Sequence, residues 1–173
     1  MNTETPTETK PITPHSLIAK IFHWGFIVIF AYAIAKQVGN VTDLNDTTLL
    51  RFEMVFAIGF LILLAVRYAF MQMTRPTALP DDTPVLVKRM ARAGHLAMYV
   101  SLAMIAISGL MIGGLFMAGF ETGLLISTAI GLHEVSLMAS YGFIALHVLA
   151  ALYHRFKGDG IWSAMVPVWT EKG

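Results

Sequence analysis

The chain of 173 residues contains no cysteine. Iron–sulfur clusters are held by cysteine thiolates, and c-type haem is attached covalently through a C-x-x-C-H motif. This chain can therefore bind neither group by itself, and it can form no disulfide bond. Any haem that it holds must be bound without a covalent link to the protein, as haem b is.

Charged residues are scarce as well. Only 13% of the residues are Asp, Glu, Lys or Arg, whereas 56% are hydrophobic. A soluble domain of this size needs more charge to cover its surface, so the composition predicts a membrane protein with several spans. Four apolar runs of about 20 residues are long enough to cross a bilayer as helices. We place these spans at Leu17–Val38, Leu49–Phe70, Gly94–Phe116 and Ile130–Tyr153. The predicted fold is an all-α, integral-membrane four-helix bundle.

Several familiar kinds of site are missing from the sequence. It has no glycine-rich nucleotide loop, no Ser/His/Asp triad pattern and no basic surface suited to nucleic acid, so we expect no nucleic-acid partner. The polar N-terminal residues do not resemble the start of a signal peptide, and we expect the first span to be retained. Three parts are predicted: a polar tail at 1–16, a transmembrane domain at 17–156, and a C-terminal segment at 157–173 that lies at the membrane interface.

Lysine and arginine are unevenly divided between the two sides of this predicted bundle. The tail, the second connection and the C-terminal segment lie on one side and, with the adjoining span ends, carry ten of the twelve Lys and Arg residues. The other side carries only Lys36 and Arg51. Because Lys and Arg gather on the cytoplasmic side of membrane proteins, both termini are predicted to be cytoplasmic.

Two of the six histidines, His133 and His147, lie fourteen residues apart in the fourth apolar run. Fourteen residues are almost four helical turns, so both side chains project from nearly one helix face, about 21 Å apart along the axis. Imidazole is a common ligand of haem iron, and ionisable groups inside a bilayer are rare unless they are functional. The pair therefore suggests one candidate haem site in each leaflet.

The candidate partner of His147 is His23. Both lie about two turns from the cytoplasmic end of antiparallel spans, the arrangement that a haem with two axial histidines needs. At the depth of His133, in contrast, the second span presents Glu53. Glu53 could be a charge at the outer interface, a proton-handling acid or a group facing a haem edge. His133 could equally have a structural role or belong to a quinone site, and any single histidine could instead hydrogen-bond a neighbouring helix.

Other polar residues lie near the cytoplasmic ends of the spans. His95 is a candidate for a quinone contact or for supporting a haem ligand. Arg67 could extend its charge to the interface or pair with haem propionates. Ser108 and four glycines would allow close approach of helices or of a flat macrocycle. Those glycines are Gly109, Gly113, Gly114 and Gly142.

Three stretches of the sequence resemble the bacterial cytochrome b561 family, which is similar to the b-type cytochrome subunits of membrane-bound hydrogenases and formate dehydrogenases. The stretches are "IFHWGF" around His23, "AGHLAMY" around His95, and "LHEVSLMASYGFIALHVLAALYHRF" from Leu132 to Phe156. The resemblance covers nearly the whole chain. It implies a four-helix membrane bundle with two b haems in the bacterial inner membrane.

The resemblance also implies the ligand pairs. His23 would pair with His147, and a second-helix histidine would pair with His133. In "LLRFEMVFAIGFLILLAVRYAF" the place of that histidine is taken by Glu53. The outer site then has three outcomes: no haem, a haem on His133 alone with Glu53 facing it, or a haem with an unusual second ligand. We favour one haem b, held by His23 and His147, and no outer haem.

The function that follows is electron transfer between haem b and a membrane quinone, with His95 and Arg67 near the quinone or the propionates. The chain would be either a quinone-linked oxidoreductase in its own right or a non-catalytic electron-transfer or anchoring subunit of a larger membrane redox complex. A scaffold without haem is the third alternative.

Overall fold

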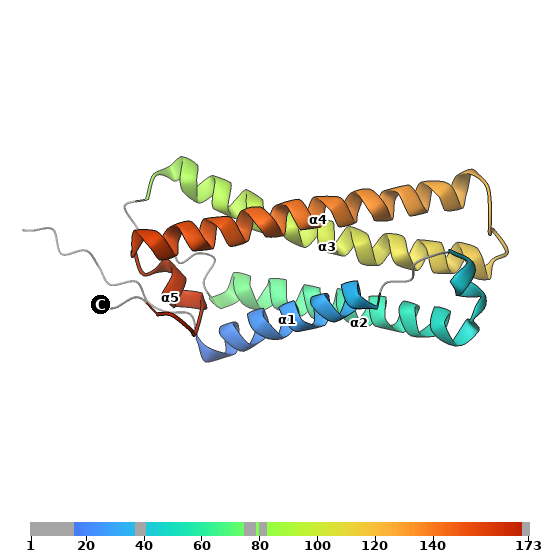
Figure 1. The fold of residues 1–173 in the computed structure, drawn as a ribbon, viewed down its shortest axis with the longest axis horizontal. Coiled ribbons are helices and arrows are strands. Elements are labelled where there is room, and N and C mark those ends of the chain that lie inside the picture. The colour runs from blue at the N-terminus through green and yellow to red at the C-terminus, as the bar shows by residue number, and fades with distance from the viewer. Residues whose placement is uncertain (1–15, 37–40, 75–78, 80–82, 171–173) are drawn as a thin grey trace, which may run out of the picture.

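The chain forms an antiparallel bundle of four long helices in a computed structural model that describes residues 16–36, 41–74, 79 and 83–170 (Figure 1). The long helices are α1 (Leu17–Ala35), α2 (Thr47–Thr74), α3 (Val85–Met117) and α4 (Leu124–Lys157). A 3₁₀ helix, η1 (Val41–Asn45), precedes α2, and a short helix, α5 (Ile161–Met165), follows α4. All four long helices are apolar and long enough to cross a membrane, and the described residues contain no strand. The predicted fold class is confirmed.

Three helices extend beyond the predicted spans, α2 by a few residues at each end and α3 and α4 by more. α3 begins at Val85, nine residues before the predicted start at Gly94, and α4 begins at Leu124 where the prediction has Ile130. Hydropathy detects only the apolar part of a helix, whereas Lys and Arg are good helix formers and continue α3 outside it. The last residues of the first predicted span, 37–38, lie outside the described residues, as do 1–15 of the predicted tail.

Local side-chain chemistry sets the helix ends. The Ser16 hydroxyl accepts a hydrogen bond from the Ala19 amide at 3.2 Å and starts α1. Asp46 does the same for α2, accepting from the Thr48 and Leu49 amides at 2.9 and 3.2 Å. These acceptors satisfy amides that the first helical turn leaves without partners. Gly158 directly follows the last residue of α4 and ends the helix, because its φ of 68° is the left-handed conformation that glycine adopts without strain.

Small side chains bring α3 and α4 together. Ser108 on α3 and Ser140 on α4 are fully buried, and each hydroxyl bonds to a carbonyl of its own helix. Such small residues allow close helix approach where lipid gives little hydrophobic driving force. Gly113 also allows a close approach, because a Cβ there would lie 3.1 Å from the Met54 side chain of α2. Gly114 and Gly142 face open space, so the prediction of close helix approach is wrong for these two glycines, and the alternative of a macrocycle beside them stays a prediction.

A cluster of buried apolar residues joins α1, α2 and α3. Its members are Phe26, Phe60, Leu64, Leu102 and Ala106. Phe26 and Phe60 have ring centres 5.1 Å apart, within the range of favourable aromatic pairs. This cluster lies between Arg67 on one side and a cavity that Phe60 and Ala106 also line on the other, so it separates the two sites described below.

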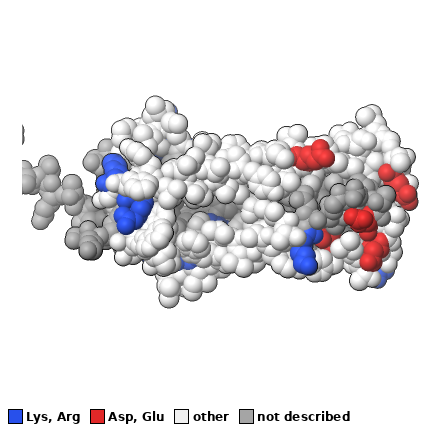
Figure 2. All heavy atoms as spheres, in the orientation of Figure 1, with Lys and Arg blue, Asp and Glu red and all other residues white. Residues whose placement is uncertain are grey.

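The two ends of the bundle differ in charge. On the face drawn in Figure 2, Lys and Arg mark the end that carries α5, and acidic residues gather towards the opposite end. The four long helices alternate in direction, so the groups of basic residues predicted to share one side do lie at one end. Lys10, Arg75 and Lys172 fall outside the described residues. The direction of the bundle in the membrane stays a prediction.

Candidate functional site

Three histidines meet near the α5 end of the bundle. The rings of His23 on α1 and His147 on α4 have centres 6.3 Å apart and are inclined at 61°. The ring of His95 on α3 has its centre 5.2 Å from that of His147, at 71°. We call His23, His95 and His147 the inner cluster. Residues more than 120 positions apart in the chain thus come together as the matched depths of α1 and α4 predicted.

The His23–His147 spacing fits one haem iron between two imidazoles. An imidazole nitrogen lies about 2.0–2.1 Å from a bound transition-metal ion and about 1.1 Å from the centre of its own ring. Two imidazoles that bind one iron from opposite sides therefore have ring centres about 6.3 Å apart. The angle between the rings is unrestricted, because each ring can turn about its metal–nitrogen bond. The 5.2 Å between His95 and His147 is too short for such a pair.

Arg67 on α2 ties the inner cluster to two other helices. Its guanidinium donates to His23 Nδ1 at 2.7 Å, to the Phe22 and His23 carbonyls at 3.4 Å each, and to the Tyr99 hydroxyl at 3.1 Å. Its Cζ atom also lies 5.1 Å from the centre of the Phe26 ring. The fork of donors on one guanidinium thus fixes α1, α2 and α3 around His23.

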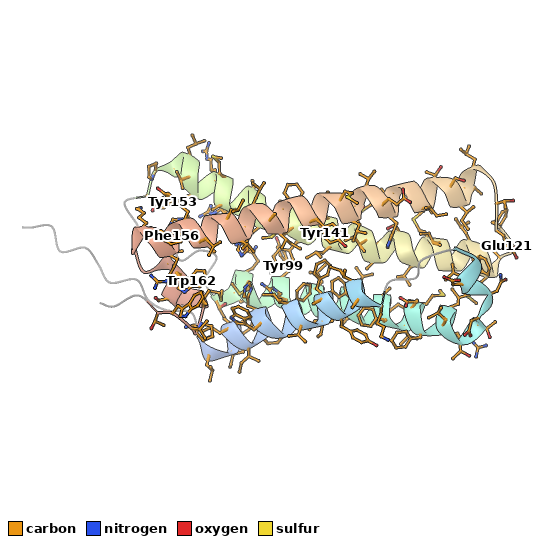
Figure 3. All side chains as sticks on the ribbon, in the orientation of Figure 1. Tyr99, Glu121, Tyr141, Tyr153, Phe156 and Trp162 are labelled. Atoms are coloured by element: carbon orange, nitrogen blue, oxygen red, sulfur yellow. The ribbon has the colours of Figure 1, made fainter. Side chains whose placement is uncertain are left out.

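Tyr99 is a site residue that the sequence analysis did not single out. It projects from α3 into the bundle (Figure 3), where its hydroxyl accepts from Arg67 and its ring packs edge-on against Tyr68 at 5.1 Å. Tyr99 lies one turn beyond His95 in the "AGHLAMY" stretch, so it shares the His95 face of α3. This four-residue spacing from His95 is the feature of the sequence from which Tyr99 could have been identified as a site residue.

His95 lies at the surface of the bundle, where it is exposed. Its Nδ1 donates to the Ala91 carbonyl of its own helix at 2.8 Å. This bond leaves the Nε2 lone pair of a neutral ring available as an acceptor. His95 is therefore placed to receive a hydrogen bond beside His147 and is reachable from outside the bundle.

A second site lies in the other half of the bundle. A partly open cavity of about 330 Å³ is bounded by residues of η1 and all four long helices. Its wall includes Glu53 on α2 together with His133 and Glu134 on α4, and its other lining residues are apolar. We call it the outer cavity. The structure thus brings Glu53 and His133 to one space, as their depths predicted.

The His133 ring is held in one orientation by Ser108. The two side chains bond at 3.0 Å between Ser108 Oγ and His133 Nδ1. The single hydroxyl hydrogen of Ser108 is directed to carbonyls of its own helix, at Met104 and Ile105, so Ser108 accepts and His133 Nδ1–H donates. The lone pair of the ring is then on Nε2.

The outer cavity does not fit a haem with two histidine ligands. His133 is the one histidine among its described lining residues, and Glu53 stands on α2 where a partner would be. A bare metal ion is not favoured either, because within the described part of the chain no three His, Asp or Glu side chains lie close enough to hold one. The inner cluster offers two imidazoles and the outer cavity one.

A small cluster of polar side chains lies between the end of α4 and the start of α5. The Asp159 carboxylate accepts from His154 Nδ1 at 2.7 Å and pairs with Lys157 Nζ at 3.2 Å. Burial by itself raises the pKa of Asp159, but the hydrogen bonds from His154 and Lys157 outweigh burial and hold that pKa below its usual value. α5 is in turn held to α1 by the Trp24 indole, which donates to the Met165 carbonyl at 3.4 Å. These contacts place α5 beside the start of α1, close to the inner cluster.

Comparisons with known proteins agree with the geometry. A family model described as prokaryotic cytochrome b561 matches residues 14–168, which include all four long helices and every histidine discussed above. Comparisons with curated proteins and with solved structures gave no significant match. The chain therefore belongs to the prokaryotic cytochrome b561 family of multi-pass bacterial membrane proteins, b-type cytochromes that bind haem and transfer electrons.

Proposed function

We propose that the inner cluster binds one haem b through His23 and His147 and that this haem exchanges electrons with a membrane quinone. The observation that carries the proposal is the 6.3 Å between the two ring centres, which is the spacing of two axial imidazoles on one iron. Haem b supplies a one-electron couple at this position. With His23 and His147 both bound, the iron would have no exchangeable position, so the site would carry electrons and would not bind oxygen.

The protein contributes a fixed and largely apolar setting. Arg67 lies beside His23 and donates to its Nδ1 atom; an iron held at Nε2 would require the ring hydrogen on Nδ1, so this hydrogen bond would be exchanged for another acceptor. The aromatic rings of Phe26 and Phe60 exclude water from the side facing the bundle centre. Fixed surroundings lower the reorganisation that accompanies a change of charge. Arg67 also supplies a cation for the propionates of a bound haem, which are carboxylates.

The quinone partner is proposed from the position of His95. A quinone dissolved in the bilayer can reach His95 because this side chain is exposed at the bundle surface, and its ring lies 5.2 Å from that of His147. The Nε2 lone pair of His95 accepts a hydrogen bond from a quinol hydroxyl. His95 would take a proton from the quinol as the quinol is oxidised, and a haem held by His23 and His147 would supply a one-electron acceptor beside it.

The test uses the full chain purified with its haem and placed in lipid nanodiscs. We expect a short-chain quinol to reduce the low-spin haem, and we expect His95→Ala to slow this reduction at least tenfold while leaving the reduced-minus-oxidised spectrum unchanged. Glu121→Gln, at the far end of the bundle (Figure 3), is the control. No reduction by quinol, together with co-purification of a larger enzyme, would instead support the alternative of a subunit in a larger redox complex.

A further inference from the structure

The outer cavity offers acceptors of hydrogen bonds and no positive charge. Its described lining contains two carboxylates, Glu53 on α2 and Glu134 on α4, and neither Lys nor Arg. Neither carboxylate forms an ion pair or a hydrogen bond with another side chain that the structure describes. When they are ionised, the walls of the cavity therefore do not neutralise them, and a bound ligand is free to do so.

His133 adds a third acceptor to this cavity. Its Nδ1–H donates to Ser108, which places the lone pair of the neutral ring on Nε2. Nε2 forms no hydrogen bond with any residue in the described part of the chain. A ligand that pairs with these groups must donate hydrogen bonds. Beside two carboxylates, a cationic donor binds more strongly than a neutral one, because hydrogen bonds between opposite charges are the stronger kind.

The other walls of the outer cavity are apolar and include three aromatic rings. Phe60 on α2 lies between the other two, with ring centres 6.3 Å from Phe30 and 6.4 Å from Phe56. Aromatic rings pack well against other rings, and their faces also attract cations. The volume of about 330 Å³ lies at the lower end of the range for ligand sites, so the space suits a ligand of one or two rings.

This lining selects against other classes of ligand. An anion, including the carboxylates of a haem, finds no Lys or Arg in the described lining. A bare metal ion finds no group of three His, Asp or Glu side chains among the described residues. Acidic residues gather towards this end on the face drawn in Figure 2, which favours the approach of cations. The cavity is open on one side, and the carboxylate of Glu134 is exposed whereas that of Glu53 is partly buried.

We infer that the outer cavity binds a small aromatic ammonium ion. The ammonium group donates hydrogen bonds to the Glu53 carboxylate and to His133 Nε2, and the aromatic part packs against Phe56 and Phe60. The inference does not rest on the proposed function, because the buried cluster around Phe60 separates the outer cavity from the inner cluster of histidines.

The experiment measures binding of naphthylmethylammonium to the full chain with its haem, in nanodiscs of phosphatidylcholine at pH 7. Equilibrium dialysis gives the bound amount, and protein-free nanodiscs give the amount that dissolves in the lipid. Naphthylmethanol has nearly the same shape and carries no charge. We expect one ammonium ion bound per chain and an affinity for the alcohol that is about tenfold lower or less, because a charged donor is replaced by a neutral one.

Two variants test where the ammonium ion binds. Glu53→Gln keeps the shape of the side chain and removes its charge, so we expect an affinity about 10–100-fold lower. Its control is Glu121→Gln, a carboxylate at the same end of the bundle that does not line the cavity, and we expect no change. Ala57→Phe fills the cavity without altering charge and should abolish binding, whereas Ala69→Phe, at an exposed position of the same helix, should not. Circular dichroism checks that each variant keeps its helices.

Three results would overturn the inference. The first is a wild-type chain that binds no naphthylmethylammonium above the level of protein-free nanodiscs. The second is equal affinity for the ammonium ion and the alcohol, which would show that the carboxylates do not contribute. The third is binding that survives either Glu53→Gln or Ala57→Phe unchanged, which would place the ammonium ion somewhere other than the outer cavity.

Discussion

Arg67 is the side chain on which the inner cluster most depends. It joins α2 to α1 and α3 through four hydrogen bonds and a contact with the Phe26 ring. Hydrogen bonds between membrane helices contribute about 0.6 kcal/mol each on average, and a cation over an aromatic ring contributes about 0.5–1 kcal/mol. Replacing Arg67 by methionine, which has similar length and no donors, should therefore lower the free energy of unfolding by about 3 kcal/mol.

The assay is reversible unfolding in mixed micelles with increasing SDS, followed by circular dichroism. Arg51→Met is the matched control, because Arg51 lies on the same helix and is exposed. A double-mutant cycle adds a second check: Tyr99→Phe should cost about 0.6 kcal/mol beside Arg67 and close to nothing beside Met at that position. If Arg67→Met destabilises the protein no more than Arg51→Met does, the reasoning about this residue is wrong.

Three further predictions concern other parts of the chain. Ser108→Ala removes the hydrogen bond between α3 and the His133 ring and should lower the free energy of unfolding by about 0.6 kcal/mol in the same SDS assay, while the low-spin haem is retained; unchanged stability would contradict this. Because the pKa of Asp159 is depressed, its carboxylate stabilises the turn before α5 above about pH 4, and this contribution is lost as the pH falls through the lower folded pKa. Asp159→Asn should therefore speed hydrogen exchange in α5 at pH 7, and the difference from the wild type should shrink as the pH falls below about 4; equal exchange at pH 7 would contradict this. Since the chain has no cysteine, single-cysteine variants report sidedness directly. Glu121→Cys should react with an impermeant thiol reagent added outside cells and Thr83→Cys only after lysis, and the reverse pattern would overturn the predicted orientation in the inner membrane.

The four spans could be predicted from the sequence alone because the lipid bilayer imposes a simple requirement. Each helix needs about 20 apolar residues to cross the bilayer, and that length is visible without any tertiary information. The paired depths of His23 and His147 followed from the same requirement. The helix ends were predicted less accurately from hydropathy. α3 begins at Val85 because a helix continues into water wherever its residues favour helix, and hydropathy does not detect this preference.

The details of the sites depended on contacts that the sequence does not show. The Ser108–His133 bond joins residues 25 positions apart, and their alignment depends on how α3 and α4 rotate against each other. Arg67 was predicted to face propionates or the interface, and its four bonds to α1 and α3 appear only when the helices are packed. The outer cavity likewise arises from the packing of five elements around small residues, so Glu53 alone could not reveal whether the space remained.

The central claim is that His23 and His147 together hold the low-spin haem. Electron paramagnetic resonance of oxidised His23→Ala, His147→Ala and His95→Ala, normalised to protein, tests it most directly. The ring-centre distances of 6.3 Å for His23 and 5.2 Å for His95, each measured to His147, predict that the low-spin signal is lost in the first two variants and kept in the third. A low-spin signal that survives His23→Ala and disappears in His95→Ala would show that the ligand pair is assigned wrongly.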